Sequence, residues 1–316
     1  MANFFKMVQS CTRKGITRVG VSSALLPAVV SIVIVSVLIF PNKARALTPV
    51  MNCSVLNTAG ETYNVINNIS SPGVGATCLN ISADNITLDC QNFTIVGNGL
   101  LNDGSAGIRL NQVSGVTVKN CIVQKFQTGI HDVADGDGNN RFEQNTANNN
   151  GDVGIVLGAS IGDIAISNTA NGNGGGFAVS GAGIVITGNI AGGTDNILRG
   201  NAANGNNGTG IVIAFPGAEN NLVIDNTAVK NTEEGILVNQ CSDNELVGNR
   251  LIGNRNNGIL LLANTSNNSL EENTAIRNGQ FGFNDFTMGL NNFVDNKCIA
   301  NVLGGSNPTG LCAPQP

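Results

Sequence analysis

One short pattern recurs along the second half of the chain. It is an asparagine, usually followed by Thr-Ala, with a second asparagine five residues after the first. Seven copies begin at Asn145, Asn168, Asn201, Asn226, Asn249, Asn273 and Asn296. Successive copies start 23, 33, 25, 23, 24 and 23 residues apart. A period of about 24 residues is typical of solenoid proteins, in which each repeat forms one turn.

A glycine followed by an apolar residue recurs with nearly the same period. These pairs begin at Gly107, Gly129, Gly154, Gly183, Gly210, Gly235, Gly258 and Gly282. Between the Asn and Gly positions the apolar residues form short alternating runs, which predicts short strands rather than helices. Such a unit can bury its apolar side only by stacking on its neighbours.

The recurrent asparagines have a physical role in this arrangement. We expect their side-chain amides to hydrogen-bond from layer to layer, and the asparagines themselves to adopt the left-handed conformation at the bends. The third residue of each copy should point inward beside the bend, where a small side chain fits. These residues are Ala147, Ala170, Ala203, Ala228, Leu251, Ala275 and Cys298.

Residues 84 to 300, from DNITLDCQNFTIVG to NNFVDNKCIAN, resemble the right-handed parallel β-helix proteins of the pectate-lyase-like superfamily. Members with short parallel β-helix repeats and exported NosD-like proteins belong to the same group. The resemblance implies an all-β fold, a single-stranded right-handed parallel β-helix of about nine turns of roughly 24 residues. We expect residues 47–83 to form an N-terminal cap and residues 301–316 a C-terminal cap or tail. This superfamily includes many activities, so the fold does not specify one.

The first 46 residues have the pattern of a signal peptide. Basic residues precede an uncharged stretch over 19–40, and Ala44-Arg45-Ala46 offers a small-x-small cleavage pattern. A retained membrane anchor is the alternative, because about 20 apolar residues can span a bilayer. Either reading predicts an exported protein that is extracellular, periplasmic or held at the cell surface.

Without this segment the chain is strongly acidic. Residues 1–46 carry six of the 16 Lys and Arg residues and none of the 21 Asp and Glu residues, which leaves 10 − 21 = −11. Such a chain should be repelled by nucleic acid, and by polyanionic glycans unless cations bridge them.

Seven cysteines follow residue 46, and in an exported protein some should be paired. Cys298 and Cys312 are the best candidates for a disulfide, and Cys53 and Cys78 are available for another at the N-terminal cap. The odd number leaves at least one cysteine unpaired. Cys121 and Cys241 can equally be small core residues.

Two candidate catalytic residues occupy equivalent places in adjacent turns. Arg109 and His131, the only histidine, each follow a Gly-Ile pair and should face outward. A base and a cation are what a lyase or C5-epimerase needs to act on a uronate. A solvated pair of His131 with Asp132 is the structural alternative.

Asp135, Asp137 and Asn139 place three oxygen ligands at alternate positions, a spacing that can wrap Ca²⁺. An ordinary turn is the alternative, since Asp, Gly and Asn dominate turns. Calcium is the one cofactor that the sequence offers.

In later turns the outward position next to the Gly-Ile pair is aliphatic. The residues are Val156, Val185, Val212, Leu237 and Leu260. An exposed aliphatic stripe often marks a partner surface, unless a bulge or loop covers it. With one Tyr and no Trp in the chain, tight stacking on a neutral glycan is not favoured.

The sequence therefore favours a non-enzymatic binding or structural module, secreted or held at the surface, whose ligand is a polysaccharide or another envelope component. The alternative is a calcium-assisted lyase or C5-epimerase acting on an acidic polysaccharide.

Overall fold

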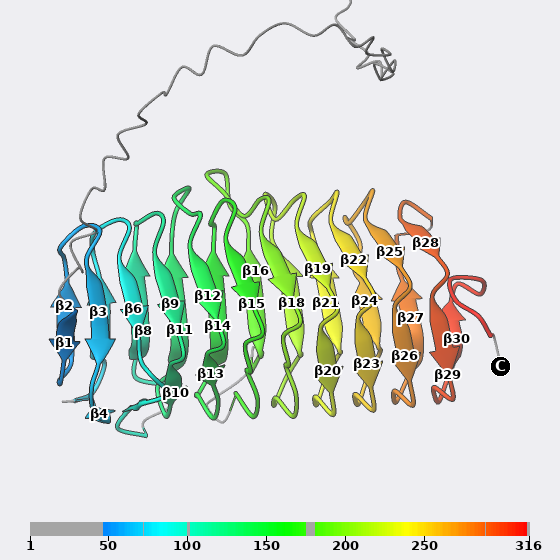
Figure 1. The fold of residues 1–316 in the computed structure, drawn as a ribbon. Helices are drawn as coiled ribbons and strands as arrows, with labels where there is room; N and C mark the ends of the chain where they lie inside the picture. The colour runs from blue at the N-terminus through cyan, green and yellow to red at the C-terminus, as the bar shows by residue number, and fades with distance from the viewer. Residues whose placement is uncertain (1–46, 72, 100–101, 175–180, 288, 315–316) are drawn as a thin grey trace, which may run out of the picture. The chain divides into compact units, whose positions relative to one another are not determined.

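The computed structural model describes residues 47–71, 73–99, 102–174, 181–287 and 289–314, which form one parallel β-solenoid (Figure 1). The predicted signal peptide or anchor, residues 1–46, lies outside these residues. Within the described ranges no helix is long and apolar enough to cross a membrane. The all-β solenoid agrees with the prediction, with about ten turns instead of about nine.

Each turn contributes strands to three parallel sheets, which we name A, B and C. Sheet A contains β1 (Thr48–Val50), β3 (Thr62–Val65), β6 (Thr87–Asp89), β9 (Thr117–Lys119), β12 (Arg141–Glu143), β15 (Ile164–Ile166), β17 (Ile197–Arg199), β19 (Leu222–Ile224), β22 (Glu245–Val247), β25 (Ser269–Glu271) and β28 (Asn292–Val294). Sheet B contains β2 (Ser54–Leu56), β5 (Thr77–Ile81), β8 (Ala106–Asn111), β11 (Thr128–Val133), β14 (Val153–Gly158), β16 (Ile184–Thr187), β18 (Ile211–Ala214), β21 (Ile236–Asn239), β24 (Ile259–Leu261), β27 (Phe281–Asp285) and β30 (Gly304–Asn307).

Sheet C consists of two four-stranded parts. The first contains β4 (Ile69–Ser70), β7 (Thr94–Val96), β10 (Ile122–Gln124) and β13 (Thr146–Ala147). The second contains β20 (Thr227–Val229), β23 (Arg250–Ile252), β26 (Thr274–Ile276) and β29 (Lys297–Ile299). Isolated bridges through Thr169 and Ala202 connect the two parts. The segments predicted as caps carry β1 to β5 and β30, whose strands pair with those of neighbouring turns.

Three ladders of side chains, all buried except the partly exposed Asn291, run along the bends, and we call them the corner ladders. The first contains Asn140, Asp163, Asn196, Asn221, Asn244, Asn268 and Asn291. The second contains Asn145, Asn168, Asn201, Asn226, Asn249, Asn273 and Asn296. The third contains Asn150, Asn173, Asn206, Asn231, Asn254, Asn278 and Asn301.

Asn226 shows how each rung is held. Its Nδ2 donates to Leu198 O at 2.9 Å and to Asn249 Oδ1 at 3.1 Å. Its Oδ1 accepts from the backbone N and from Nδ2 of Asn201, both at 2.9 Å. A buried amide is stable here because every donor and acceptor has a partner. The predicted layer-to-layer amide bonds are therefore present.

The prediction that these asparagines themselves adopt the left-handed conformation is wrong. The residue before each rung except Asn291 does so: Asp225 has φ 54° and Lys230 has φ 55°. That preceding residue makes the bend, which leaves the asparagine free to turn its side chain inward to the ladder.

The recurrent glycine follows from the third ladder. A Cβ on Gly235 would lie 2.8 Å from Asn254 Nδ2 and 2.6 Å from Gly258 O. The same clash with a third-ladder amide recurs at Gly129, Gly154, Gly183, Gly210, Gly258 and Gly282. Only glycine allows strand and ladder to approach this closely.

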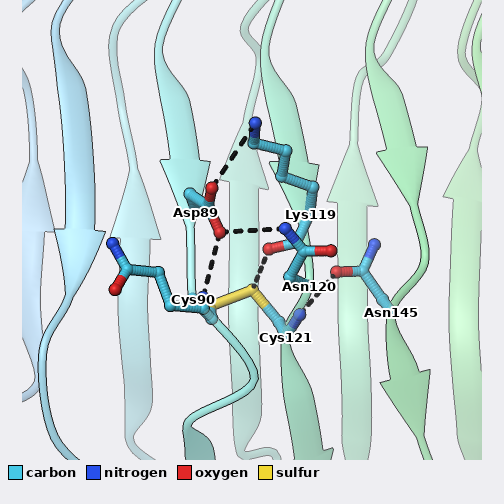
Figure 2. Close-up of polar contacts among 7 residues, drawn as sticks. Asp89, Cys90, Lys119, Asn120, Cys121 and Asn145 are labelled. Atoms are coloured by element: carbon cyan, nitrogen blue, oxygen red, sulfur yellow. Dashed lines mark hydrogen bonds and ion pairs between the residues drawn. A yellow bond between two sulfur atoms is a disulfide. The ribbon is translucent and has the colours of Figure 1, made fainter.

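Two disulfides hold the turns that precede the ladders, and a third lies at their C-terminal end. Cys53 is bonded to Cys78, Cys90 to Cys121 and Cys298 to Cys312, while Cys241 is free and buried. Cys121 lies where the second ladder begins, since its backbone N donates to Asn145 Oδ1 at 3.1 Å (Figure 2). Beside the disulfide, Asp89 pairs with Lys119 at 3.4 Å and accepts from Asn120 Nδ2 at 3.0 Å.

Core side chains of sheet C are larger in the turns that precede the ladders than in the turns that contain them. The inward residues of sheet C are Ile69, Ile95 and Val123 in the first turns, and mostly alanine beside the ladders. Buried ladder amides occupy space at the corner, so only a small neighbour fits beside them.

Candidate functional site

Arg109 and His131 lie side by side on the outer face of sheet B. His131 on β11 is in register with Arg109 on β8 and with Val156 on β14. The same column continues through Val185, Val212, Leu237 and Leu260. All of these side chains are partly exposed. The polar start and the aliphatic continuation therefore lie in one line.

His131 is half-buried, and this controls its charge. Burial first, and then the guanidinium of Arg109, lower the pKa of His131 to about 4, while Asp152 acts in the opposite direction. The imidazole is therefore neutral at pH 7 and has a nitrogen lone pair available to accept a proton or a hydrogen bond.

An open hollow of about 290 Å³ lies beside His131. Its polar lining comes from Gln112, His131, Asp135, Thr187 and Asn189. These residues lie near the ends of β8, β11 and β16, with β14 between β11 and β16 in sheet B (Figure 1). Amide, carboxylate, hydroxyl and imidazole groups thus converge on a small volume.

A second hollow of about 300 Å³ shares Asn189 with the first. Its walls are mostly apolar and come from Ile161, Ile190, Ala191, Pro216 and Gly217. Ile190 is fully exposed. We call the two hollows together the Asn189 groove.

Asn189 holds the groove in place. Its Nδ2 donates to Asp135 Oδ1 at 3.1 Å, across two turns of the solenoid. Its Oδ1 accepts from the backbone N of Ala191 at 2.7 Å and of Gly192 at 3.0 Å. The side chain therefore ties the loop of residues 188–193 to the turn that contains Asp135.

The three candidate calcium ligands are exposed on the turn after β11. Asp135 already accepts the hydrogen bond from Asn189. Among the described residues no group of three or more His, Cys, Asp or Glu side chains can hold a metal ion. The calcium site of Asp135, Asp137 and Asn139 remains a prediction, and no chemistry is assigned to it below.

The aliphatic stripe is not peculiar to sheet B. Sheet A carries an outward column of Ile164, Ile197 and Leu222. Sheet C carries one of Val229, Ile252, Ile276 and Ile299. Aliphatic residues in register stabilise neighbouring strands wherever they occur. What distinguishes sheet B is the polar start of its column and the groove beside it.

The sequence did not identify Gln112, Thr187, Asn189 or Pro216 as site residues. The 33-residue interval between Asn168 and Asn201 predicts an extra loop at GGGFAVSGAG, of which residues 175–180 lie outside the described residues. The available signals were Gly192-Gly193 and Pro216-Gly217, which interrupt the repeat directly after β16 and β18.

Comparisons with known structures identify the same fold. The Dettilon tailspike protein (gp208) is 18% identical with a TM-score of 0.62, over 80% of this chain and 54% of the tailspike. The chain thus spans about half the length of that protein. The A-module of the Azotobacter vinelandii mannuronan C-5 epimerase AlgE4 is 13% identical with a TM-score of 0.53, over 81% of this chain and 87% of the module.

A third structure is the catalytic domain of an alpha-1,3-glucanase in complex with tetrasaccharides. It is 14% identical with a TM-score of 0.52, over 82% of this chain and 61% of that domain. The comparison with curated proteins found no match. A family model described as "Right handed beta helix region" matches residues 80–215 and 180–309. Together these matches cover more than half of the chain, which therefore belongs to the right-handed β-helix family.

Proposed function

We propose that the chain binds a glycan in the Asn189 groove. The observation that carries this proposal is the meeting of two kinds of surface at Asn189, one polar beside His131 and one apolar beside Ile190. Sugars present both hydroxyl groups and apolar ring faces, and each needs its own kind of wall. Aliphatic side chains here take the place of the aromatic platforms that the chain lacks.

Two structures of the same fold have names that refer to carbohydrate. One is a mannuronan epimerase and the other is an alpha-1,3-glucanase in complex with tetrasaccharides. These names support a glycan as the ligand class, whereas the choice of the groove rests on this chain's own residues.

An exported location also fits a glycan ligand. Three disulfides are present in the described residues. Disulfides persist in oxidising compartments outside the cytosol. We propose that the protein acts in the periplasm, outside the cell or at its surface, where envelope polysaccharides are available.

A lyase or C5-epimerase is the second candidate, and the position of His131 beside Arg109 favours it. A neutral imidazole can remove the C5 proton of a uronate, and the adjacent Arg109 can neutralise the uronate carboxylate. The β-elimination of a lyase would then break the bond at C4, while an epimerase would return a proton to the opposite face of C5.

Isothermal titration calorimetry with neutral and acidic oligosaccharides tests the binding proposal. Because a lost hydrogen bond removes about 1 kcal/mol, His131→Ala and Thr187→Ala should each weaken binding roughly fivefold. Leu237→Ala is the matched control, since Leu237 lies in the column of His131 but outside both hollows. Equal loss in the control, or no binding of any oligosaccharide by wild type, contradicts the proposal.

The same samples separate binding from catalysis. Ultraviolet absorbance detects unsaturated uronates, and proton NMR detects inversion at C5. Binding without product supports a binding module. Product that disappears in both His131→Ala and Arg109→Ala assigns the enzyme instead.

A further inference from the structure

Asp132 interrupts an aliphatic column in the core of sheet B. Leu110 and Leu157 are its partners in the neighbouring turns, and the column continues as Ile186, Ile213, Val238 and Leu261. Asp132 is 0% exposed. A carboxyl group at this position loses its contact with water and must find partners inside the protein.

Asp163 interrupts the first corner ladder, in which every other rung is an asparagine. Its Oδ1 keeps the role of an asparagine oxygen, because it accepts from Asn140 N at 2.8 Å. Its Oδ2 takes the place of an amide nitrogen, so an acceptor stands where the ladder has a donor. Asp163 is also 0% exposed.

The two exceptions meet. Asn140 Nδ2 donates to Asp132 Oδ2 at 3.1 Å while its backbone N binds Asp163, so one residue contacts both carboxyl groups. The two carboxyl groups also lie close enough to interact directly. Asp132 Oδ1 and Asp163 Oδ2 are buried, and neither has a hydrogen-bond partner when both carboxyl groups are unprotonated. One proton placed between them gives both oxygens a partner.

We propose that Asp132 and Asp163 form a buried proton-binding site, which holds one proton between the two carboxyl groups at neutral pH. Neither group takes part in the ion pairs among the described residues, which are Lys119 with Asp89 and Arg141 with Glu143. The partner carboxylate and the nearby Asp137 both oppose ionisation of Asp132, and β8 and β14 offer only leucines. The backbone N of Asn140 donates to Asp163, whereas the hydroxyl of Ser160 donates to Asn196 Oδ1.

The pH dependence follows from this environment. Burial, and then the contact with Asp163, raise the pKa of Asp132 to about 10. The folded protein keeps a proton that the unfolded chain releases near the ordinary value of 3.8. Stability from this site is therefore complete at low pH and is lost as pH rises toward 10. His131, whose lowered pKa has the opposite effect, acts only below 6.5, which leaves the range from 6.5 to about 10 for the test.

The experiment compares unfolding midpoints of residues 47–316 from pH 6.5 to about 10. The double variant Asp132→Leu, Asp163→Asn restores both columns and has no proton to lose. We expect the wild-type midpoint to fall across this range and that of the double variant to fall less. Asp195→Asn is the control, because Asp195 is an exposed aspartate in the next turn, and it should keep the wild-type slope.

An infrared measurement keeps the proposal testable if the double variant does not fold. Wild type at neutral pH should show the carbonyl band of a protonated carboxyl group, and Asp163→Asn should remove it. No such band in wild type overturns the proposal. Stabilisation of wild type by added Ca²⁺ or Na⁺ that is absent in Asp163→Asn also overturns it, because a cation would then occupy the place of the proton.

Discussion

Two groups of turns share one architecture, those of residues 220–278 and those of residues 128–217. They differ in whether the repeated asparagine and aliphatic positions keep their usual residues. In the first group each corner has its asparagine and the outer column of sheet B is aliphatic. In the second group Asp132 and Asp163 replace a core aliphatic residue and a ladder asparagine, and His131 stands in the outer column.

The difference separates two kinds of constraint. Where only stacking matters, each position is fixed by its neighbour in the next turn. Departures from local rules concentrate at functional or strained sites. Here they collect in the turns that form the Asn189 groove.

Loss of a central rung in the regular turns should have the largest effect on stability. Asn226→Leu removes the four hydrogen bonds of this side chain, which join it to Asn201 N, Asn201 Nδ2, Asn249 Oδ1 and Leu198 O. At about 1 kcal/mol for each lost hydrogen bond, we expect a loss of roughly 4 kcal/mol. Urea denaturation followed by circular dichroism measures it. Asn292→Ala is the control, because this asparagine is exposed, and it should change the free energy of unfolding by less than about 0.5 kcal/mol. A similar loss in both variants would show that the ladder hydrogen bonds add no stability of their own.

Removal of the disulfide at the start of the ladders should follow in size. Cys90 and Cys121 are 31 residues apart, and the loop-closure model gives about 3–4 kcal/mol for such a link. The double variant Cys90→Ser, Cys121→Ser should therefore unfold at a lower denaturant concentration. Cys241→Ser is the control, because Cys241 is free and its substitution breaks no disulfide. If the double variant is as stable as wild type, the first turns are held by packing alone.

Acidification tests how burial of His131 contributes to the stability of the turns that contain residues 128–217. Its folded-state pKa is lowered from 6.5 to about 4, so its contribution to stability is present above 6.5 and is lost as pH falls toward 4. The shift corresponds to no more than about 3 kcal/mol. Histidine NMR should show an imidazole that stays neutral at pH 6. Titration at the ordinary value, in wild type as in the unfolded chain, would contradict the half-buried position.

Changes at the tip of the groove should have the smallest effect on stability. Ile190 is fully exposed, so Ile190→Ser should alter stability by less than about 0.5 kcal/mol. Glycan binding should nevertheless weaken, because Ile190 lines the apolar hollow. Thermal unfolding and calorimetry on the same sample separate the two effects. Unchanged affinity would remove the apolar hollow from the binding site.

Much of the fold was predictable because stacking imposes a visible period. The second and third ladders and the inward alanines were readable from the recurrent NTA units. The first ladder was not recognised, because its asparagines are followed by residues as different as Arg141, Leu222 and Glu245. The left-handed residue was assigned one position too late, since Asn has a high preference for that conformation but is needed here for its amide.

The candidate site was only partly predictable. His131 and Arg109 were identified because each is an exception in a repeated position. Asp163 was missed, since its exception is visible only once the first ladder is known. Asn189 belongs to a loop whose path depends on a contact with Asp135, 54 residues earlier, and no local pattern encodes such a contact.

The most direct test of the account is an NMR titration of labelled residues 47–316 with neutral and acidic oligosaccharides. We predict that chemical shifts change around the Asn189 groove, at Gln112, His131, Asn189 and Gly217, while the regular turns stay unchanged. Chemical-shift changes confined to the outer columns of the regular turns, or no change with any oligosaccharide, would contradict the proposal that the turns that depart from the repeat form the glycan site.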